Sequence, residues 1–158
     1  MSIPQAGTTA PDFSLPADND EQLKLSSLKG KPVVLFFYPK DDTTGCTKEA
    51  CSFRDALPRF DKMNATILGI SPDSTKSHRK FKEKYDLPYA LLADEDHKIA
   101  EQYGVWGEKS MYGRKYMGIL RTTFVIDAKG KIAKVFEKVK PDEHATEVAE
   151  AVAALNLR

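Results

Sequence analysis

The sequence of 158 residues is short of the features that mark several large classes of protein. Its 24 basic and 23 acidic residues leave a net charge of +1, so charge gives no reason to expect nucleic acid or an anionic membrane as a partner. No apolar run approaches the ~20 residues that cross a bilayer. Residues 1–5 lack the basic and apolar regions of a signal peptide, so we expect a cytoplasmic protein. The length fits one domain, over residues 1–158.

Cysteine and histidine are also scarce. The only cysteines are Cys46 and Cys51, and the three histidines, His78, His97 and His144, are scattered. A structural metal site takes about four ligands, so we expect neither a metal nor another cofactor. We expect the three histidines to lie at the surface. In a cytoplasmic protein, two neighbouring cysteines indicate redox chemistry more often than a structural disulfide.

A run of apolar β-forming residues over 32–38 predicts a strand buried on both faces, and Pro39 ends it. Strands and helices then alternate, and a turn signature at 127–131 predicts a final hairpin. This order predicts an α/β, thioredoxin-like fold, with a central mixed β-sheet flanked by helices on both faces. Residues 106–118 are predicted to form a long loop. The other expected strands cover 65–70, 91–93, 122–126 and 132–136, and the expected helices begin near residue 44 and cover 74–85, 94–103 and 142–155.

Cys46 lies in the first turn of the helix that follows the loop after Pro39. Unpaired backbone N–H groups and the helix dipole favour negative charge at that position, and the thiolate is the nucleophilic form of cysteine. Thr43 is placed to donate a hydrogen bond to the sulfur or to a bound oxygen, and Pro39 can shape the loop and exclude water. Attack of the thiolate on a peroxide would give a sulfenic acid, which a second thiol can convert to a disulfide.

Cys51 follows Cys46 by five residues in the same predicted helix. At about 100° and 1.5 Å per residue, their α-carbons would lie roughly 8.5 Å apart, with side chains about 140° apart. A disulfide needs α-carbons within about 7 Å and converging side chains. We therefore hypothesise that the first turns of this helix unwind after Cys46 is oxidised.

The spacing of Pro39, Thr43 and Cys46 matches the active-site pattern Pro-x-x-x-Thr-x-x-Cys of peroxiredoxins. Residues 45–52 resemble the bacterioferritin comigratory protein subfamily, also called peroxiredoxin Q. The likeness extends over nearly the whole chain, through the segments Ala10–Phe13, Phe36–Pro39 and Arg121–Phe124.

The resemblance implies an enzyme that reduces hydrogen peroxide and organic hydroperoxides. Cys46 would be its peroxidatic cysteine and Cys51 its resolving cysteine. Arg121 would donate to the peroxide oxygen and stabilise the thiolate, and Glu49 would orient the arginine. The reductant would be thioredoxin or a glutaredoxin-like dithiol protein, and the enzyme would be a monomer.

Plainer interpretations of these residues remain open. Cys51 could be a core residue, Thr43 a loop or capping residue, and Arg121 one half of a surface ion pair. Glu49 could simply complement the positive end of the helix.

Two other functions also compete with the peroxidase. The first is a thioredoxin-type disulfide oxidoreductase, although the Cys-x-x-Cys spacing of that class is absent. The second is a redox sensor or chaperone that a Cys46–Cys51 disulfide would switch.

Overall fold

A five-stranded mixed sheet forms the centre of the computed structural model, which describes residues 2–141 and 144–155. The strand order is β5-β4-β3-β8-β9. β3, β4 and β5 run parallel, whereas β8 and β9 are antiparallel to their neighbours, which confirms the predicted mixed sheet. The bounds are Val33–Phe37 for β3, Thr66–Ser71 for β4, Ala90–Ala93 for β5, Thr122–Ile126 for β8 and Ile132–Phe136 for β9.

β3 is the central strand and contributes side chains to both faces of the sheet. Val33, Leu35 and Phe37 belong to one hydrophobic cluster, and Val34 and Phe36 belong to the other. Because successive side chains of a strand point to opposite faces, a strand between two cores needs an unbroken apolar run. The run over residues 32–38 meets that requirement.

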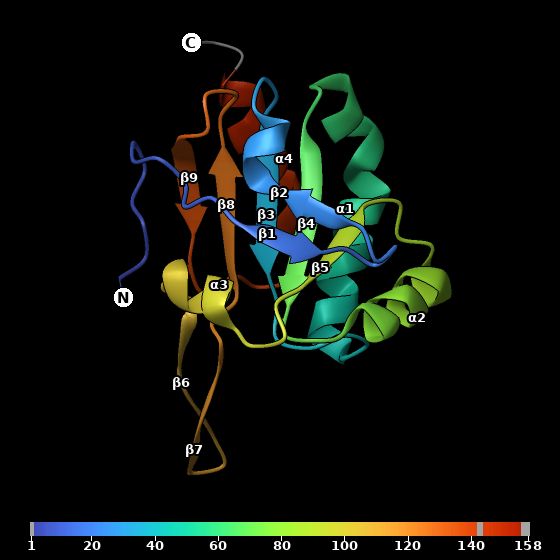
Figure 1. The fold of residues 1–158 in the computed structure, drawn as a ribbon, viewed down its shortest axis with the longest axis vertical. Helices are drawn as coiled ribbons and strands as arrows, with labels where there is room; N and C mark the ends of the chain where they lie inside the picture. Colours follow the sequence, from blue (N-terminus) through green and yellow to red (C-terminus); the bar gives the residue numbers. More distant parts are fainter. Residues whose placement is uncertain (1, 142–143, 156–158) are drawn as a thin grey trace.

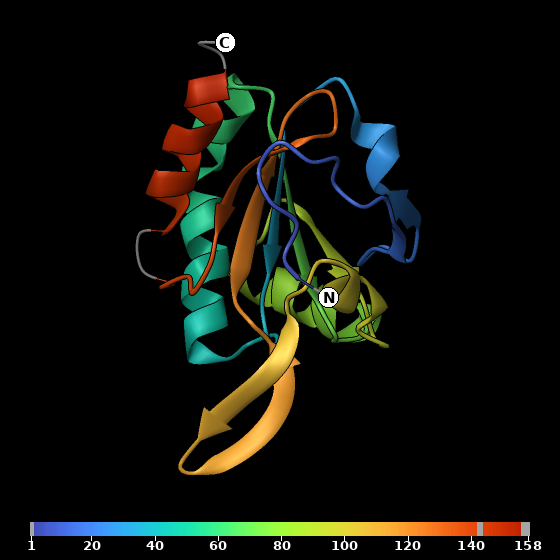
Figure 2. The same cartoon turned by 90° about the vertical axis from the view of Figure 1, so that its left-hand side faces the viewer.

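Helices α1 (Thr44–Lys62) and α4 (His144–Leu155) pack side by side on one face of the sheet (Figures 1 and 2). Helix α2 (Thr75–Tyr85) adds Phe81 to the same cluster. Phe53 and other apolar residues of the predicted helical face of α1 pack into this core. The helix predicted over 142–155 is confirmed from His144 onward, and residues 142 and 143 lie outside the described part of the chain.

Shorter elements cover the opposite face. They are the hairpin of β1 (Ser14–Pro16) and β2 (Gln22–Lys24), a 3-10 helix at Leu25–Leu28, and α3 (Lys98–Gln102). The sequence did not predict this hairpin, because three-residue strands give too few alternations to recognise. α3 is shorter than the helix predicted over 94–103, because Asp94 accepts hydrogen bonds from backbone N–H groups of the helix instead of joining it.

The predicted long loop over 106–118 is wrong. These residues form an antiparallel hairpin of β6 (Trp106–Met111) and β7 (Arg114–Ile119), which projects from the body of the molecule (Figures 1 and 2). Its turn places Tyr112 and Gly113 at φ +52° and +78°. Asparagine or aspartate usually precedes the glycine in such turns, so Tyr112 hides the signal.

Within the described residues, no helix is both long and apolar enough to cross a membrane.

Candidate active site

The register of the central sheet brings Arg121 close to the start of α1, where Cys46 lies. Phe37, the last residue of β3, pairs with Thr122, the first residue of the antiparallel β8. Arg121 therefore lies at the end of the sheet where the chain leaves β3 and leads to α1. Local sequence cannot reveal this proximity, because 75 residues separate Arg121 from Cys46.

Cys46 is the third residue of α1 and its side chain is buried. Nη2 of Arg121 donates a hydrogen bond to Sγ of Cys46 at 3.3 Å. The sulfur thus receives two favourable influences on negative charge, the amino end of a 19-residue helix and a guanidinium cation. Both favour the thiolate, which is the reactive form.

The same guanidinium holds Glu49. Nη1 of Arg121 donates to Oε1 of Glu49 at 2.7 Å, so one planar group bridges two residues of α1. Cys46 and Glu49 are three positions apart, and such residues are neighbours on one face of a helix. Arg121 is thus a partly buried bridge between a buried thiol and a buried carboxylate, which does not fit the plainer interpretation of a surface ion pair.

Burial shifts the pKa of Arg121 and that of Glu49 in opposite directions. Burial alone would lower the pKa of Arg121, but Glu49 and Cys46 raise it above its ordinary value. Burial raises the pKa of Glu49 to about 7, although the guanidinium of Arg121 acts against this shift. Oε2 of Glu49 is buried and has no hydrogen-bond partner among the described residues. Its ionised form is therefore only partly compensated.

Gly45 and Lys109 also belong to the site, and the sequence did not identify either as functional. A Cβ on Gly45 would lie 3.3 Å from Nη2 of Arg121, so the glycine leaves room for the guanidinium. Lys109 reaches back from β6, and its Nζ donates to the carbonyl oxygen of Ile119 at 2.9 Å. Burial and the nearby Arg121 lower the pKa of Lys109, whereas Cys46 raises it, so Lys109 is a second cation near the sulfur.

Cys51 lies in the same uninterrupted helix as Cys46, and both thiols are free. Its side chain is half-buried. Burial raises the pKa of the Cys51 thiol, Arg54 acts against the shift, and Asp55 adds to it. The local surroundings therefore favour the neutral thiol at Cys51.

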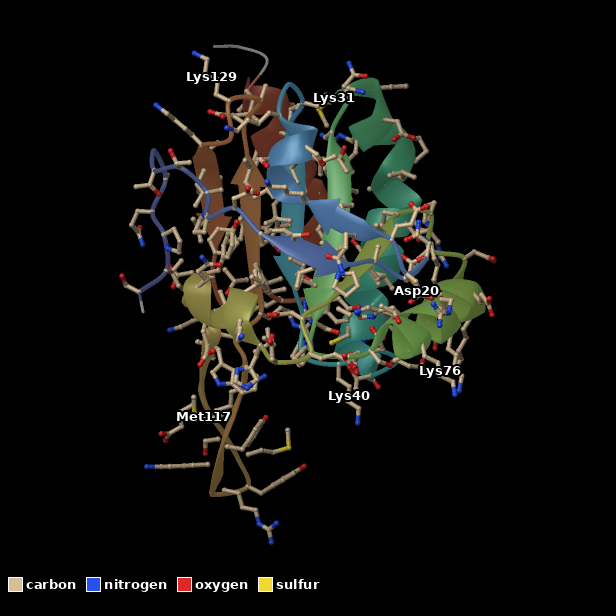
Figure 3. All side chains as sticks on the ribbon, viewed as in Figure 1. Asp20, Lys31, Lys40, Lys76, Met117 and Lys129 are labelled. Atoms are coloured by element: carbon tan, nitrogen blue, oxygen red, sulfur yellow. The ribbon has the colours of Figure 1, made fainter. Side chains whose placement is uncertain are left out.

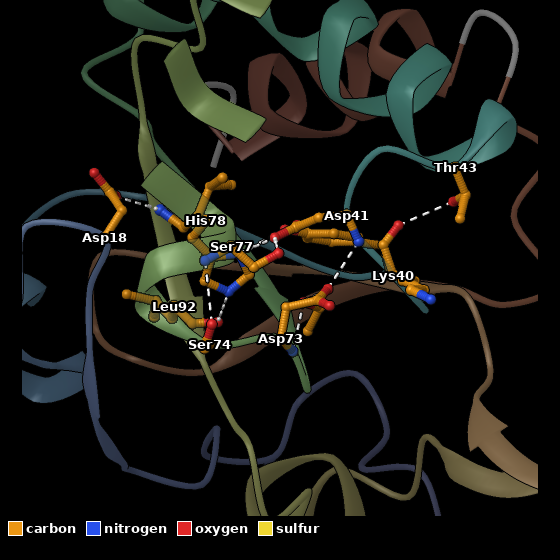
Figure 4. A network of polar contacts seen from close by, with 12 residues as sticks. Asp18, Lys40, Asp41, Thr43, Asp73, Ser74, Ser77, His78 and Leu92 are labelled. Carbon is orange, nitrogen blue, oxygen red and sulfur yellow. Dashed lines mark hydrogen bonds and ion pairs between the residues drawn. The ribbon is translucent and has the colours of Figure 1, made fainter. Parts of the chain in front are cut away.

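Thr43 and Pro39 lie in the loop that leads into α1. Thr43 is the N-cap residue, and its hydroxyl donates to the carbonyl oxygen of Lys40 at 2.9 Å (Figure 4). The expected bond from this hydroxyl to the sulfur is therefore not formed here, because its single proton is directed into the loop. A contact with a bound oxygen stays a prediction. Pro39 is half-buried just beyond β3, and its role in excluding water also stays a prediction.

Asp41 anchors this loop to the sheet and to α2 (Figure 4). Its backbone N–H donates to Oδ2 of Asp73 at 2.7 Å. Its carboxylate accepts from the hydroxyls of Tyr38 and Ser77 at 2.6 and 2.8 Å and lies 2.7 Å from Nδ1 of His78. The loop before α1 is therefore fixed at Asp41 by several short contacts.

His78 is fully buried, so the expectation that the histidines lie at the surface is wrong for this residue. Its Nδ1 faces the Asp41 carboxylate and its Nε2 faces the carbonyl oxygen of Leu92 at 2.9 Å. The side chains of Asp41, Asp73 and His78 bring ligand-type atoms within 4.8 Å of one another, but hydrogen bonds within the network already engage them. The cluster is a structural anchor.

His144 is the second buried histidine, and it too contradicts the expectation of a surface position. Its Nε2 lies 2.7 Å from the Thr123 hydroxyl and its Nδ1 lies 2.6 Å from Glu147. Burial lowers the pKa of His144, against the effect of Glu147. Glu147 is three residues further along α4, whereas Thr123 comes from packing of α4 on β8, which local sequence does not reveal.

A thioredoxin-like sheet that presents one buried cysteine to an arginine defines a class of protein, the thiol-dependent peroxidases. The chain belongs to the AhpC/TSA family, whose pattern matches residues 6–135. Within that family it is a peroxiredoxin of the bacterioferritin comigratory protein, or peroxiredoxin Q, branch, as the relatives below show.

Two curated relatives support this placement. The putative peroxiredoxin bcp of Coxiella burnetii is 55% identical over 148 residues, which cover 94% of this chain and 97% of the relative. Peroxiredoxin Bcp of Bacillus subtilis is 51% identical over 151 residues, which cover 96% and 94%.

Solved structures agree. A mutant of PrxQ from Xylella fastidiosa superposes with a TM-score of 0.92 at 34% identity and covers 99% of both chains. The bacterioferritin comigratory protein of Xanthomonas campestris, studied for its alkyl peroxide reduction activity, gives a TM-score of 0.89 at 37% identity and covers 96% of this chain and 99% of its own.

The buried Glu49 carboxyl should make folding stability depend on pH. Its pKa is raised from 4.5 to about 7 in the folded protein, so its stabilising effect is complete below pH 4.5 and is lost as the pH rises through 7. The expected loss reaches about 3 kcal/mol. Glu49→Gln should remove this slope, because glutamine can still accept from Arg121 but does not titrate.

Urea unfolding of both proteins between pH 4 and pH 8 provides the measurement. Other groups titrate equally in both proteins, so the difference between the two curves isolates Glu49. Parallel curves would contradict the burial of an ionisable Glu49.

Proposed function

We propose that Cys46 reduces hydroperoxides by direct attack of its thiolate. The sulfur attacks one peroxide oxygen, the O–O bond breaks, and sulfur supplies the two electrons. Cys46 becomes a sulfenic acid, and the departing alkoxide or hydroxide takes a proton to form an alcohol or water. The observation that carries this proposal is the 3.3 Å hydrogen bond from Arg121 to Sγ of Cys46. A nearby guanidinium can also stabilise charge on the leaving oxygen.

Arg121 acts as the positioning and charge-stabilising group, and Glu49 holds its orientation. A guanidinium offers several N–H donors in one rigid plane, so it can serve the sulfur and the carboxylate together. Thr43 and Pro39 complete the site, and the Thr43 hydroxyl turns from the carbonyl oxygen of Lys40 to a bound peroxide oxygen. Gly45 leaves the space that this arrangement requires.

Cys51 resolves the sulfenic acid. Its thiol attacks the sulfur of Cys46, one water leaves, and an intramolecular disulfide forms. Because both residues lie in one helix, the first turns of α1 unwind in this step. A dithiol protein, thioredoxin or a glutaredoxin-like protein, then supplies two electrons and two protons and returns both thiols.

The substrates are hydrogen peroxide and organic hydroperoxides, a range supported by the alkyl peroxide reduction activity of the Xanthomonas campestris relative. The enzyme works in the cytoplasm as a monomer. One domain carries out the reaction, because both hydrophobic clusters share the same sheet. A thioredoxin-type oxidoreductase is less well supported, since the two cysteines lack the Cys-x-x-Cys spacing.

Two cysteine variants should separate peroxidase turnover from a single oxidation event. Cys46→Ser should abolish peroxide consumption. Cys51→Ser should still form one sulfenic acid at Cys46, but its thioredoxin-linked turnover should fall sharply. Intact mass after one equivalent of peroxide distinguishes the added oxygen of a sulfenic acid from the loss of two hydrogens in a disulfide.

Peroxide turnover measured with a thioredoxin system completes the test. Normal turnover by Cys51→Ser would remove Cys51 from the mechanism. Stoichiometric oxidation of the native protein without turnover would favour the redox sensor instead.

Arg121→Lys should slow the first oxidation of Cys46 by roughly 10- to 100-fold, because a charge-assisted hydrogen bond contributes about 1.5–3 kcal/mol. Lysine keeps the charge but cannot bridge Cys46 and Glu49 with one rigid plane. Stopped-flow measurement of the second-order rate with hydrogen peroxide checks this expectation. Arg79→Lys is the matched control, since Arg79 of α2 forms its ion pair with Asp20. Equal rates for both variants would exclude a role for the guanidinium.

A further inference from the structure

The hydroxyl of Tyr89 contacts the backbone of α1 immediately before Cys51. Tyr89 precedes β5, is 5% exposed, and packs edge-on against Phe36 with ring centroids 5.8 Å apart. Its hydroxyl donates to the carbonyl oxygen of Ala50 at 2.6 Å. That carbonyl belongs to the peptide bond between Ala50 and Cys51, so the hydrogen bond fixes the chain on the amino side of Cys51.

The residues just after Cys51 are also held by neighbouring elements. Nη1 of Arg54 donates to the carbonyl oxygen of Tyr85, the last residue of α2, at 2.7 Å. The backbone N–H of Ala145 in α4 donates to the hydroxyl oxygen of Ser52 at 3.3 Å. Together with Tyr89, these contacts attach the helix around Cys51 to three separate parts of the fold.

The turn that carries Cys46 is attached differently. Arg121 binds both Sγ of Cys46 and Oε1 of Glu49 in this turn. Oxidation removes the negative charge from the sulfur and weakens the bond that Arg121 makes to it. None of the three attachments around Cys51 involves a sulfur atom, so oxidation leaves them intact.

We propose that Tyr89 is a positioning residue that stops the unwinding of α1 at the peptide bond between Ala50 and Cys51. This inference rests on the proposed resolving role of Cys51. Cys51 is then the stationary partner, and Cys46 moves to it as the preceding turns open. Without the hydroxyl, unwinding would extend into the next turn, and Cys51 would lose its fixed position.

The point at which the unwinding of α1 stops determines which backbone amide protons keep their hydrogen bonds. In an α-helix, the N–H of residue i bonds to the carbonyl of residue i−4. If unwinding ends before the carbonyl of Ala50, the N–H groups of residues 51–53 lose their acceptors, and the N–H of Arg54 keeps its own. Arg54 is therefore the first protected amide that we expect in the disulfide form.

Hydrogen exchange resolved by NMR on the peroxide-oxidised full-length protein tests the proposal. Tyr89→Phe removes only the hydroxyl and keeps the ring beside Phe36. Its Arg54 amide should lose protection by about fivefold or more, as expected for loss of one ordinary hydrogen bond. Tyr103→Phe is the matched control, because the Tyr103 hydroxyl also donates to a carbonyl oxygen, that of Pro11, on the opposite face of the sheet.

The competition between the two reactions of the Cys46 sulfenic acid gives a second measurement. Its outcome would not change if Tyr89 only stabilised the fold. In excess peroxide, Cys46 sulfenic acid either reacts with Cys51, releasing water, or takes an oxygen from a second peroxide and becomes a sulfinic acid. Tyr89→Phe should raise the ratio of sulfinic acid to disulfide about fivefold over the native protein and Tyr103→Phe, as measured by intact mass.

Three results would overturn the inference. They are an unprotected Arg54 amide in the native disulfide form, an unchanged boundary and partition in Tyr89→Phe, and a lower share of sulfinic acid in that variant. The first result needs no variant, so the test holds even if Tyr89→Phe folds poorly. Absence of any Cys46–Cys51 disulfide in the native protein would instead overturn the proposed function.

Discussion

The guanidinium of Arg121 lies between a sulfur and a carboxylate of the same helix, and its contacts depend on several parts of the fold. The pairing of β3 with β8 delivers the arginine, the three-residue spacing aligns Cys46 with Glu49, and Gly45 leaves the necessary space. One nitrogen reaches the sulfur at 3.3 Å and another reaches the carboxylate at 2.7 Å. This arrangement favours a thiolate in a place where burial alone would disfavour charge.

The same arrangement gives the two cysteines different surroundings. Cys46 has the helix end and the cations nearby, whereas Cys51 is held in the helix by Tyr89 and by contacts of its neighbours. A five-residue spacing within an intact helix keeps the thiols apart in the reduced enzyme. In the proposed mechanism, the helix therefore permits reaction with peroxide first and disulfide formation only after part of it has opened.

Local patterns predicted a large part of this structure. The apolar run of β3, the helix after it and the reactive position of Cys46 all follow from periodicity and from the chemistry of helix ends. The residue that binds the sulfur was reached only through the resemblance to peroxiredoxins. Glu49 and Arg121 are 72 residues apart, and only the sheet register brings them together.

The positions of Lys109 and His78 were not predicted, and each has a physical reason. The sequence predicts a loop at Lys109 because Tyr112 replaces the usual turn residue of the β6–β7 hairpin. Exposed side chains of this hairpin, including the labelled Met117, extend into solvent (Figure 3). His78 was expected at the surface because the sequence does not show that Asp41 and Leu92 offer it two buried acceptors. The partners of His78 are distant in sequence, and the strand that carries Lys109 depends on a single turn.

Arg121 and the amino end of α1 together favour negative charge on the sulfur of Cys46. The most direct test of this effect is the ultraviolet absorbance of the thiolate in Cys51→Ser, where Cys46 is the single thiol. We predict that the thiolate signal of this variant falls when Arg121→Met is added, because the guanidinium that donates to Sγ is lost. An equal signal in the two proteins would contradict this expectation.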